Sequence, residues 1–287
     1  MGDTGHLNTI IRAWDQGRPA FAAFAHADPQ TAIELSTAPY DGIIFEMEHN
    51  PFDVQGLQDA LQYLLNRQQI FSAGSLAPAV TPIVRVPANG VERNQSFAKQ
   101  ALDRGVYGVV WPHIGDADQA YNAVSSCRYA RPKSAASYEP AGVRGDGPAS
   151  ACRYWGLTQQ EYYAKADVWP LDPNGELLVC IMCESVRGLT NLDDILGRVP
   201  GIGCVLIGEG DLSQELGFPR QYDHPHVKEA MDHVLATCKK HNVPVGHPHV
   251  TAGNVERVLA EGYRLLVSAP VRSYGAVQKA KDVLGVK

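Results

Sequence analysis

Cysteine is scarce in this sequence, and the few copies do not resemble a disulfide framework. Six cysteines occur in 287 residues, whereas small secreted domains are dense in cysteine. Cys180 and Cys183 form a C-x-x-C pair within an apolar run that we predict to be a strand. Positions three apart on a strand face opposite sides, so we expect core thiols rather than a metal or redox site. No leader of charged, then apolar, then small residues is present, and we expect a cytoplasmic protein.

The sequence also lacks an excess of basic residues, internal repeats, and any apolar run long enough to cross a membrane. Its 25 Lys and Arg residues against 31 Asp and Glu give a net charge of −6. This balance argues against nucleic acid or an anionic membrane as a partner. No linker-like stretch interrupts the chain, and α/β barrels often reach ~250 residues as one domain. We therefore expect residues 1–287 to form a single domain.

Apolar runs of strand length alternate with helical patterns along the chain. Helices are expected at 4–17, 31–35, 53–64, 90–104, 117–127, 186–196, 223–241, 252–261 and 271–284. Eight strands are expected at 21–24, 42–45, 81–86, 108–111, 177–183, 204–207, 243–246 and 265–268. Eight alternating units predict a (β/α)8 TIM barrel. Residues 66–80 are expected to form a polar loop, and 128–175 a long insertion that serves as a lid or an interface.

Two carboxylates follow successive predicted strands. Glu184 comes directly after the strand at 177–183. Asp211 follows the strand at 204–207, at the end of the run Gly208-Glu209-Gly210-Asp211. A parallel β-α-β unit brings both strand ends to the same rim, so the two side chains should be neighbours. The glycines at 208 and 210 would let backbone amides face a ligand. This pattern suits a hard divalent cation that carries an anionic substrate, although either acid alone also fits a helix start.

Other polar residues at predicted strand ends are Glu46, Glu48, His49, Arg85, His113, His247 and His249. Polar side chains at the C-terminal rim of a barrel are typical of catalytic residues. Arg85 offers a planar donor fork for an oxyanion, and His49 a base that titrates near neutrality. The other three histidines are interpreted as hydrogen-bonded rim or pocket residues rather than ligands.

Five motifs in unbroken order resemble one known family, the class II pyruvate aldolases of the HpcH/HpaI aldolase/citrate lyase family. The resemblance covers about residues 21–287. The motifs are Glu46 to Pro51, Val84 to Pro87, Pro140 to Gly145, Glu184-Ser185, and Gly208 to Ser213. The resemblance implies a metal-dependent barrel that cleaves 4-hydroxy-2-oxo acids to pyruvate, or a related 2-oxo acid, and an aldehyde.

Residue roles carried over from the resemblance follow the motif positions. Glu184 and Asp211 match the ligands of a divalent metal, with Mg²⁺, Mn²⁺ or Co²⁺ as candidates. Arg85 matches the arginine that stabilises the enolate, and His49 matches the base. Asp103 matches an acid supplied to that histidine from an adjacent subunit.

The resemblance also implies a substrate carboxylate site and an assembly. The backbone amides of Gly210 and Asp211 match the carboxylate site. Family members are commonly hexamers built from dimers that exchange the final helix, here 271–284, so we expect a homo-oligomer.

Several positions depart from the family pattern. Met182 stands where the family usually carries a glutamine, and a thioether cannot hydrogen-bond a substrate oxygen strongly. Glu209 adds a carboxylate to the fifth motif, and Glu46 replaces a shorter acid. The substrate-binding role of Met182 is therefore expected to be that of an apolar pocket residue.

Three other functions compete with the aldolase hypothesis. A decarboxylase of oxaloacetate type would use the same enolate. A metal hydrolase would combine His113, His247 and His249 with Asp211. A metabolite-binding protein would hold a 2-oxo acid without turnover. No lysine lies near a predicted strand end, which argues against a Schiff base.

Overall fold

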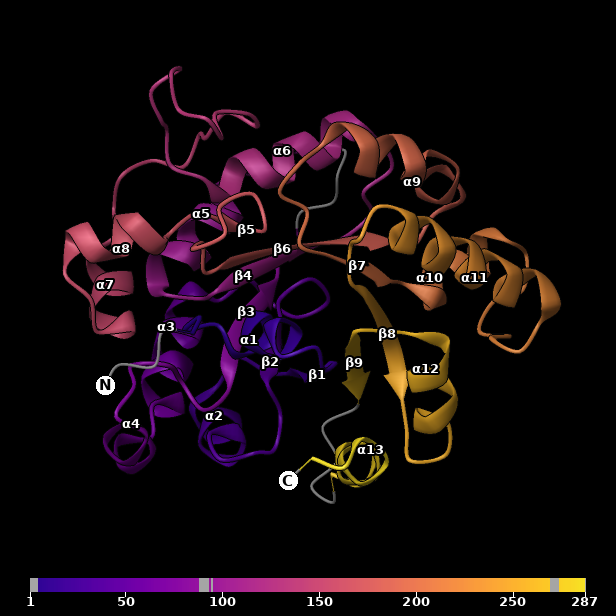
Figure 1. The fold of residues 1–287 in the computed structure, drawn as a ribbon, viewed down its shortest axis with the longest axis horizontal. Helices are drawn as coiled ribbons and strands as arrows, with labels where there is room; N and C mark the ends of the chain where they lie inside the picture. Colours follow the sequence, from indigo (N-terminus) through magenta and orange to yellow (C-terminus); the bar gives the residue numbers. More distant parts are fainter. Residues whose placement is uncertain (1–4, 88–92, 94, 269–273, 287) are drawn as a thin grey trace.

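The computed structural model describes residues 5–87, 93, 95–268 and 274–286. Eight parallel strands form a closed ring, in which β4 pairs with β6 to complete the order β4-β3-β2-β1-β9-β8-β7-β6 (Figure 1). These strands are β1 (Ala20–Ala25), β2 (Gly42–Glu46), β3 (Thr81–Arg85), β4 (Gly108–Trp111), β6 (Leu177–Cys183), β7 (Cys204–Ile207), β8 (Val245–Val250) and β9 (Leu265–Ser268). The short β5 (Val168–Trp169) pairs in parallel with the first two residues of β6. The predicted (β/α)8 barrel is confirmed.

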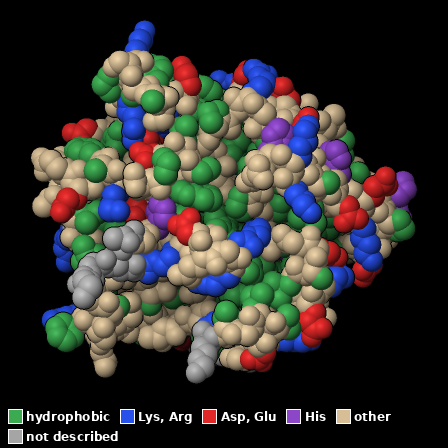
Figure 2. All heavy atoms as spheres, in the orientation of Figure 1, with side chains coloured by type: hydrophobic (Ala, Val, Ile, Leu, Met, Phe, Trp, Pro, Cys, Tyr) green, Lys and Arg blue, Asp and Glu red, His purple; other side chains and the backbone are tan. Residues whose placement is uncertain are grey.

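Helices surround this ring of strands (Figure 1). They are α1 (Thr9–Asp15), α2 (Pro29–Leu35), α3 (Val54–Leu64), α4 (Arg67–Ala73), α5 (Gln95–Arg104), α6 (Ala117–Cys127), α7 (Ala149–Trp155), α8 (Gln159–Lys165), α9 (Val186–Arg198), α10 (Glu209–Glu215), α11 (Pro225–Lys240), α12 (Val255–Glu261) and α13 (Gly275–Leu284). In the described part of the chain, no helix is both long and apolar enough to cross a membrane. On the face drawn in Figure 2, basic and acidic side chains are interspersed.

Successive side chains on each strand face opposite sides of the sheet, which divides the core into a barrel interior and an outer layer under the helices. Cys180 belongs to the interior cluster and Cys183 to the outer one, because neighbours three apart on a strand face opposite sides. Both thiols are free and buried. The expectation that this C-x-x-C pair does not converge is confirmed.

Helix α1 closes the N-terminal end of the barrel. Ile10 belongs to the interior cluster, and a Cβ on Gly42, at the start of β2, would lie 2.5 Å from Ile10 Cδ1. The buried Glu176 carboxylate fixes the segment before α1 by accepting bonds of 2.9 Å from the amides of Leu7 and Asn8. Access to the barrel is therefore left at its opposite, C-terminal rim.

Two segments expected to be loops contain regular structure. Helix α4 lies within 66–80, capped by Asn66, whose side chain accepts a 3.0 Å bond from the Gln69 amide, and ended by Gly74 at a φ of 61°. It buries no residue, so the apolar periodicity that predicts most helices is missing. The segment 128–175 holds α7, α8 and β5. Strand β8 runs on to Val250, which puts His247 and His249 within the strand rather than after it.

Candidate active site

A cavity of about 400 Å³ lies at the C-terminal rim of the barrel. Its lining includes six of the seven residues expected to act in catalysis, substrate binding or metal binding: His49, Arg85, Met182, Glu184, Gly210 and Asp211. Arg85 ends β3, Glu184 follows β6, and Asp211 lies in the first turn of α10 after β7. These residues therefore lie close together, as their positions after the strands predicted, while their individual roles stay predictions.

The carboxylate of Glu184 is buried and closely packed. Its side chain is 2% exposed, and its Oε1 accepts a 2.5 Å hydrogen bond from the amide of His113. Burial raises the pKa of Glu184 to about 8, and the negative charges of Glu48 and Asp211 add to this. A Cβ on residue 208 would lie 2.4 Å from Glu184 Cβ, so this position requires glycine. Helix α9 is capped by Ser185, which excludes Glu184 as that helix's cap.

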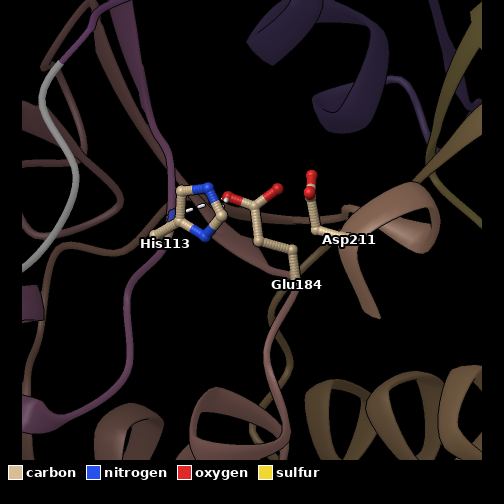
Figure 3. A group of neighbouring side chains, drawn as sticks. All are labelled: His113, Glu184 and Asp211. Atoms are coloured by element: carbon tan, nitrogen blue, oxygen red, sulfur yellow. Dashed lines mark hydrogen bonds and ion pairs between the residues drawn. The ribbon is translucent and has the colours of Figure 1, made fainter. Parts of the chain in front are cut away.

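Two other side chains with possible ligand atoms, those of His113 and Asp211, lie beside the Glu184 carboxylate. His113 from the end of β4, Glu184 and Asp211 each offer one ligand atom, and these atoms lie within 4.8 Å of one another (Figure 3). Glu184 and Asp211 repel each other when both are ionised, and a divalent cation between them would remove that repulsion. The donor set fits a metal ion. The aldolase hypothesis did not include a nitrogen of His113 among the ligand atoms, and only the hydrolase alternative combined this residue with Asp211.

Arg85 lies between two acids from the turn after β2. Its Nη2 is ion-paired with Glu46, and its Nη1 lies 3.0 Å from Glu48 Oε2. The guanidinium carbon also lies 4.7 Å from the ring centroid of Phe24. Burial raises the pKa of Glu48 although Arg85 opposes this. The Nε of Arg85 is buried and has no hydrogen-bond partner in the described chain.

Met182 forms an apolar part of the cavity beside Arg85. Its Sδ lies 3.7 Å from Arg85 Nη1, and its side chain belongs to the barrel interior cluster. Met182 is 3% exposed. This position agrees with the expectation that Met182 is an apolar pocket residue.

The two nominated proton-transfer residues, His49 and Asp103, lie apart in this chain. The His49 side chain is 68% exposed, and its Nε2 is 3.6 Å from Glu48 Oε2. Asp103 does not line the cavity and instead pairs with the buried Arg144, whose Nη2 lies 2.9 Å from Asp103 Oδ1. Burial raises the pKa of Asp103. Within the described residues, no contact joins His49 to Asp103.

The remaining histidines differ in environment. His247 is buried edge-on against the ring of Tyr263, with 5.0 Å between centroids. His249 is ion-paired with the buried Glu209 and stacks on Tyr222. The additional carboxylate of Glu209 thus serves a histidine on the cavity wall. The hydrolase hypothesis required His247 and His249 beside Asp211. Within the described residues, the convergent metal-ligand group contains only His113 among these histidines.

Known proteins resemble this chain in sequence and in fold. A model of the HpcH/HpaI aldolase/citrate lyase family matches residues 22–268. A 2-keto-3-deoxy-L-rhamnonate aldolase of Klebsiella pneumoniae subsp. pneumoniae is 34% identical over 230 residues, 79% of this chain and 73% of that protein. A 5-keto-4-deoxy-D-glucarate aldolase of the same organism is 31% identical over 222 residues, 77% of this chain and 74% of that protein.

A solved structure extends the similarity to the whole fold. The crystal structure of a HpcH/HpaI aldolase/citrate lyase family protein from Burkholderia cenocepacia J2315 superposes with a TM-score of 0.73 at 27% identity. The alignment covers 96% of this chain and 97% of that chain. The resemblance carried by the five motifs is confirmed. The chain is therefore an enzyme of the aldolase type that belongs to the HpcH/HpaI aldolase/citrate lyase family.

Proposed function

We propose that this protein is a divalent-metal-dependent aldolase that cleaves or forms 4-hydroxy-2-oxo acids from pyruvate, or a related 2-oxo acid, and an aldehyde. The observation that carries the proposal is the convergence of Glu184, Asp211 and Arg85 on one rim cavity. Two similar proteins are named as aldolases of deoxy keto sugar acids. We therefore infer a polyhydroxylated 2-oxo acid as the substrate class.

The metal would be held by the carboxylates of Glu184 and Asp211. When bound, a divalent cation acts as a Lewis acid toward the oxygens of a 2-oxo acid. The sequence expectation of Mg²⁺ or Mn²⁺ follows from these oxygen donors. The backbone amides of Gly210 and Asp211 lie in the first turn of α10, where helix amides lack partners within the helix. They are suited to hold the substrate carboxylate.

Cleavage breaks the bond between C3 and C4 of the substrate and leaves the electron pair on the 2-oxo acid fragment. Arg85 stabilises the ketone oxygen as it gains negative charge, because its guanidinium is a fixed donor in a partly buried site. His49, at the mouth of the cavity, takes the proton of the 4-hydroxyl through a water as the aldehyde forms. Return of a proton to C3 completes the 2-oxo acid product.

We extend the proposal to the oligomeric state, the cellular location and the domain organisation of the protein. We infer a homo-oligomer, with a hexamer as the expected form, because Asp103 and His49 lie apart in one chain, whereas the family resemblance implies that the acid at position 103 serves the histidine of an adjacent subunit. We also infer a cytoplasmic location, because the six cysteines are free in the structure. Residues 1–287 are proposed to act as one barrel domain.

A product assay tests this function. Purified protein is mixed with a 4-hydroxy-2-oxo sugar acid and, separately, with oxaloacetate, and pyruvate, aldehyde and CO₂ are measured with and without exhaustive chelation. We expect equimolar pyruvate and aldehyde, lost on chelation and restored by Mn²⁺. Release of CO₂ from oxaloacetate without any release of aldehyde from the sugar acid would favour the decarboxylase. Covalent trapping of pyruvate by borohydride, or full activity after chelation, would overturn the metal-dependent scheme.

A further inference from the structure

His113 occupies a position that the carboxylate-only metal site does not explain. The residue lies two positions after the end of β4 with a φ of 53°, a left-handed conformation that is uncommon for a residue other than glycine. This turn directs its amide to Glu184 Oε1 at 2.5 Å and brings its Nδ1 to 3.7 Å from the same oxygen. Backbone and ring of one residue thus both face the buried carboxylate.

The imidazole has no hydrogen-bonding role in the described chain. Its Nδ1 lies 3.7 Å from Glu184 Oε1, and its Nε2 lies 3.8 Å from Glu48 Oε1. Both distances exceed the range of a hydrogen bond. Glu184 Oε2 likewise accepts no hydrogen bond from the described residues, although the side chain is only 2% exposed. A ring nitrogen and a buried carboxylate oxygen are therefore both available for another partner.

We propose that His113 is a third protein ligand, so that this chain holds its metal through one imidazole nitrogen and two carboxylate oxygens. The inference rests on the proposed function, in which Glu184 and Asp211 are the other two ligands. Metal bonds of ~2.1 Å put adjacent ligand atoms ~3 Å apart and opposite ones ~4.2 Å apart. The three candidate atoms already lie within 4.8 Å of one another. Small side-chain rotations complete the site.

The nitrogen ligand changes which metal is preferred. Carboxylate and water ligands suit Mg²⁺ and Mn²⁺, whereas imidazole suits Zn²⁺ and other transition metals. Addition of His113 should raise the affinity for Co²⁺ and Zn²⁺ more than that for Mg²⁺. With three protein ligands, the other coordination positions stay open for a chelating 2-oxo acid.

Metal-binding experiments that do not depend on activity test the proposal. Chelator-treated wild type, His113→Asn and His113→Gly are titrated calorimetrically with Co²⁺, Zn²⁺ and Mg²⁺. Asparagine and glycine both tolerate the left-handed backbone and keep the amide that bonds Glu184. We expect Co²⁺ and Zn²⁺ affinity to fall at least ~10- to 100-fold, the scale set by loss of a supporting partner of a ligand. Mg²⁺ affinity should change by less than about threefold.

Pulsed electron paramagnetic resonance of the Mn²⁺-loaded protein gives a direct readout. Coupling to an imidazole nitrogen should be present in wild type, absent in both His113 variants, and retained in His249→Asn, which removes one of the two imidazoles, His49 and His249, that line the cavity. The third ligand alone would be overturned if Glu184→Gln abolished metal binding, His113→Gly left it unchanged, and the wild type showed no nitrogen coupling. Metal binding that survives in Glu184→Gln would instead overturn the proposed metal site. Melting temperatures of all variants check folding.

Discussion

Asp103 and Arg144 form an ion pair outside the cavity, with 2.9 Å between Asp103 Oδ1 and Arg144 Nη2. The arginine is buried, lies over the ring of Tyr129 at 4.4 Å, and bonds the hydroxyl of Tyr162 at 2.9 Å. The Asp103 side chain remains 18% exposed. A fixed guanidinium thus holds a carboxylate at the protein surface, where a neighbouring subunit could receive it.

We predict that His49 and Asp103 act in one site across a subunit interface. His49→Ala and Asp103→Asn homo-oligomers should each be nearly inactive, because every site lacks one partner. Dissociation and reassembly of the two together should restore a fraction of the activity, since some sites then draw His49 from one chain and Asp103 from the other. Steady-state rates of verified mixed oligomers measure this.

The Asp103 variant requires a folding control because it leaves Arg144 without its carboxylate. Loss of one partner of a buried pair commonly costs about 3–5 kcal/mol, and the exposure of Asp103 should reduce this. Melting temperature and oligomer size should therefore be measured before mixing. Mixed oligomers as inactive as either parent, or an active isolated monomer, would contradict the shared site.

The carboxylates at 184 and 211 should dominate metal binding. Glu184→Gln and Asp211→Asn each remove one ligand charge, so calorimetric titration with Mn²⁺ should show at least ~10²-fold weaker binding, and turnover should be lost. Asp193→Asn on α9 is a matched control, because Asp193 pairs with Lys240 at the surface. Equal Mn²⁺ affinity in all four proteins would exclude this site.

Arg85→Lys should fold but turn over slowly. An ammonium is a point charge, and it cannot serve Glu46, Glu48 and a substrate oxygen together as the planar fork does. Loss of one oxyanion donor lowers kcat by ~10²-fold or more. Arg257→Lys, which changes an arginine paired with Glu261 on α12, controls for the substitution itself. A near-normal kcat at saturating substrate would make the arginine structural.

Met182→Gln tests the departure beside Arg85. The variant places an amide where the thioether contacts Arg85 Nη1, so the floor of the cavity becomes polar. We expect the ratio of kcat/KM values between pyruvate and other 2-oxo acid donors to change, while Mn²⁺ affinity stays within about threefold. Cys180→Ser, two residues earlier on the same face of β6, controls for polarity in the barrel interior. An unchanged donor profile would make Met182 ordinary core.

The sequence predicts the strands well because each is an apolar run between turn signals, and their closure places Glu184, Asp211 and Arg85 together. It does not predict α4, whose short helix depends on its caps rather than on a buried face. It also misses His113 as a neighbour of Glu184. That contact depends on the pairing of β4 with β6, and the segment 128–175 separates these strands in the chain. The position of His113 in the turn after β4, two residues beyond Trp111, was the only available signal.

The pairing of Glu209 with His249 was hidden for a similar reason. It depends on β8 extending to Val250, whereas the apolar signal of this strand ends near Gly246 because prolines and histidines follow. Local sequence therefore predicts which residues reach the rim more readily than which of them touch.

The last prediction concerns stability below neutral pH and the buried His247. Burial lowers the pKa of His247 below its ordinary value of 6.5, although the nearby Glu209 opposes this. At a pH between the folded pKa and 6.5, His247 therefore binds a proton in the unfolded chain but stays neutral in the folded protein. The free energy of unfolding should therefore fall as the pH drops through this window, by at most about 1.4 kcal/mol per pH unit for one proton. His247→Gln should remove this component, whereas His233→Gln, at an exposed position on α11, should not. Urea unfolding at pH 5.5, 6.5 and 7.5 measures all three proteins, and equal pH slopes for wild type and His247→Gln would contradict a neutral buried imidazole.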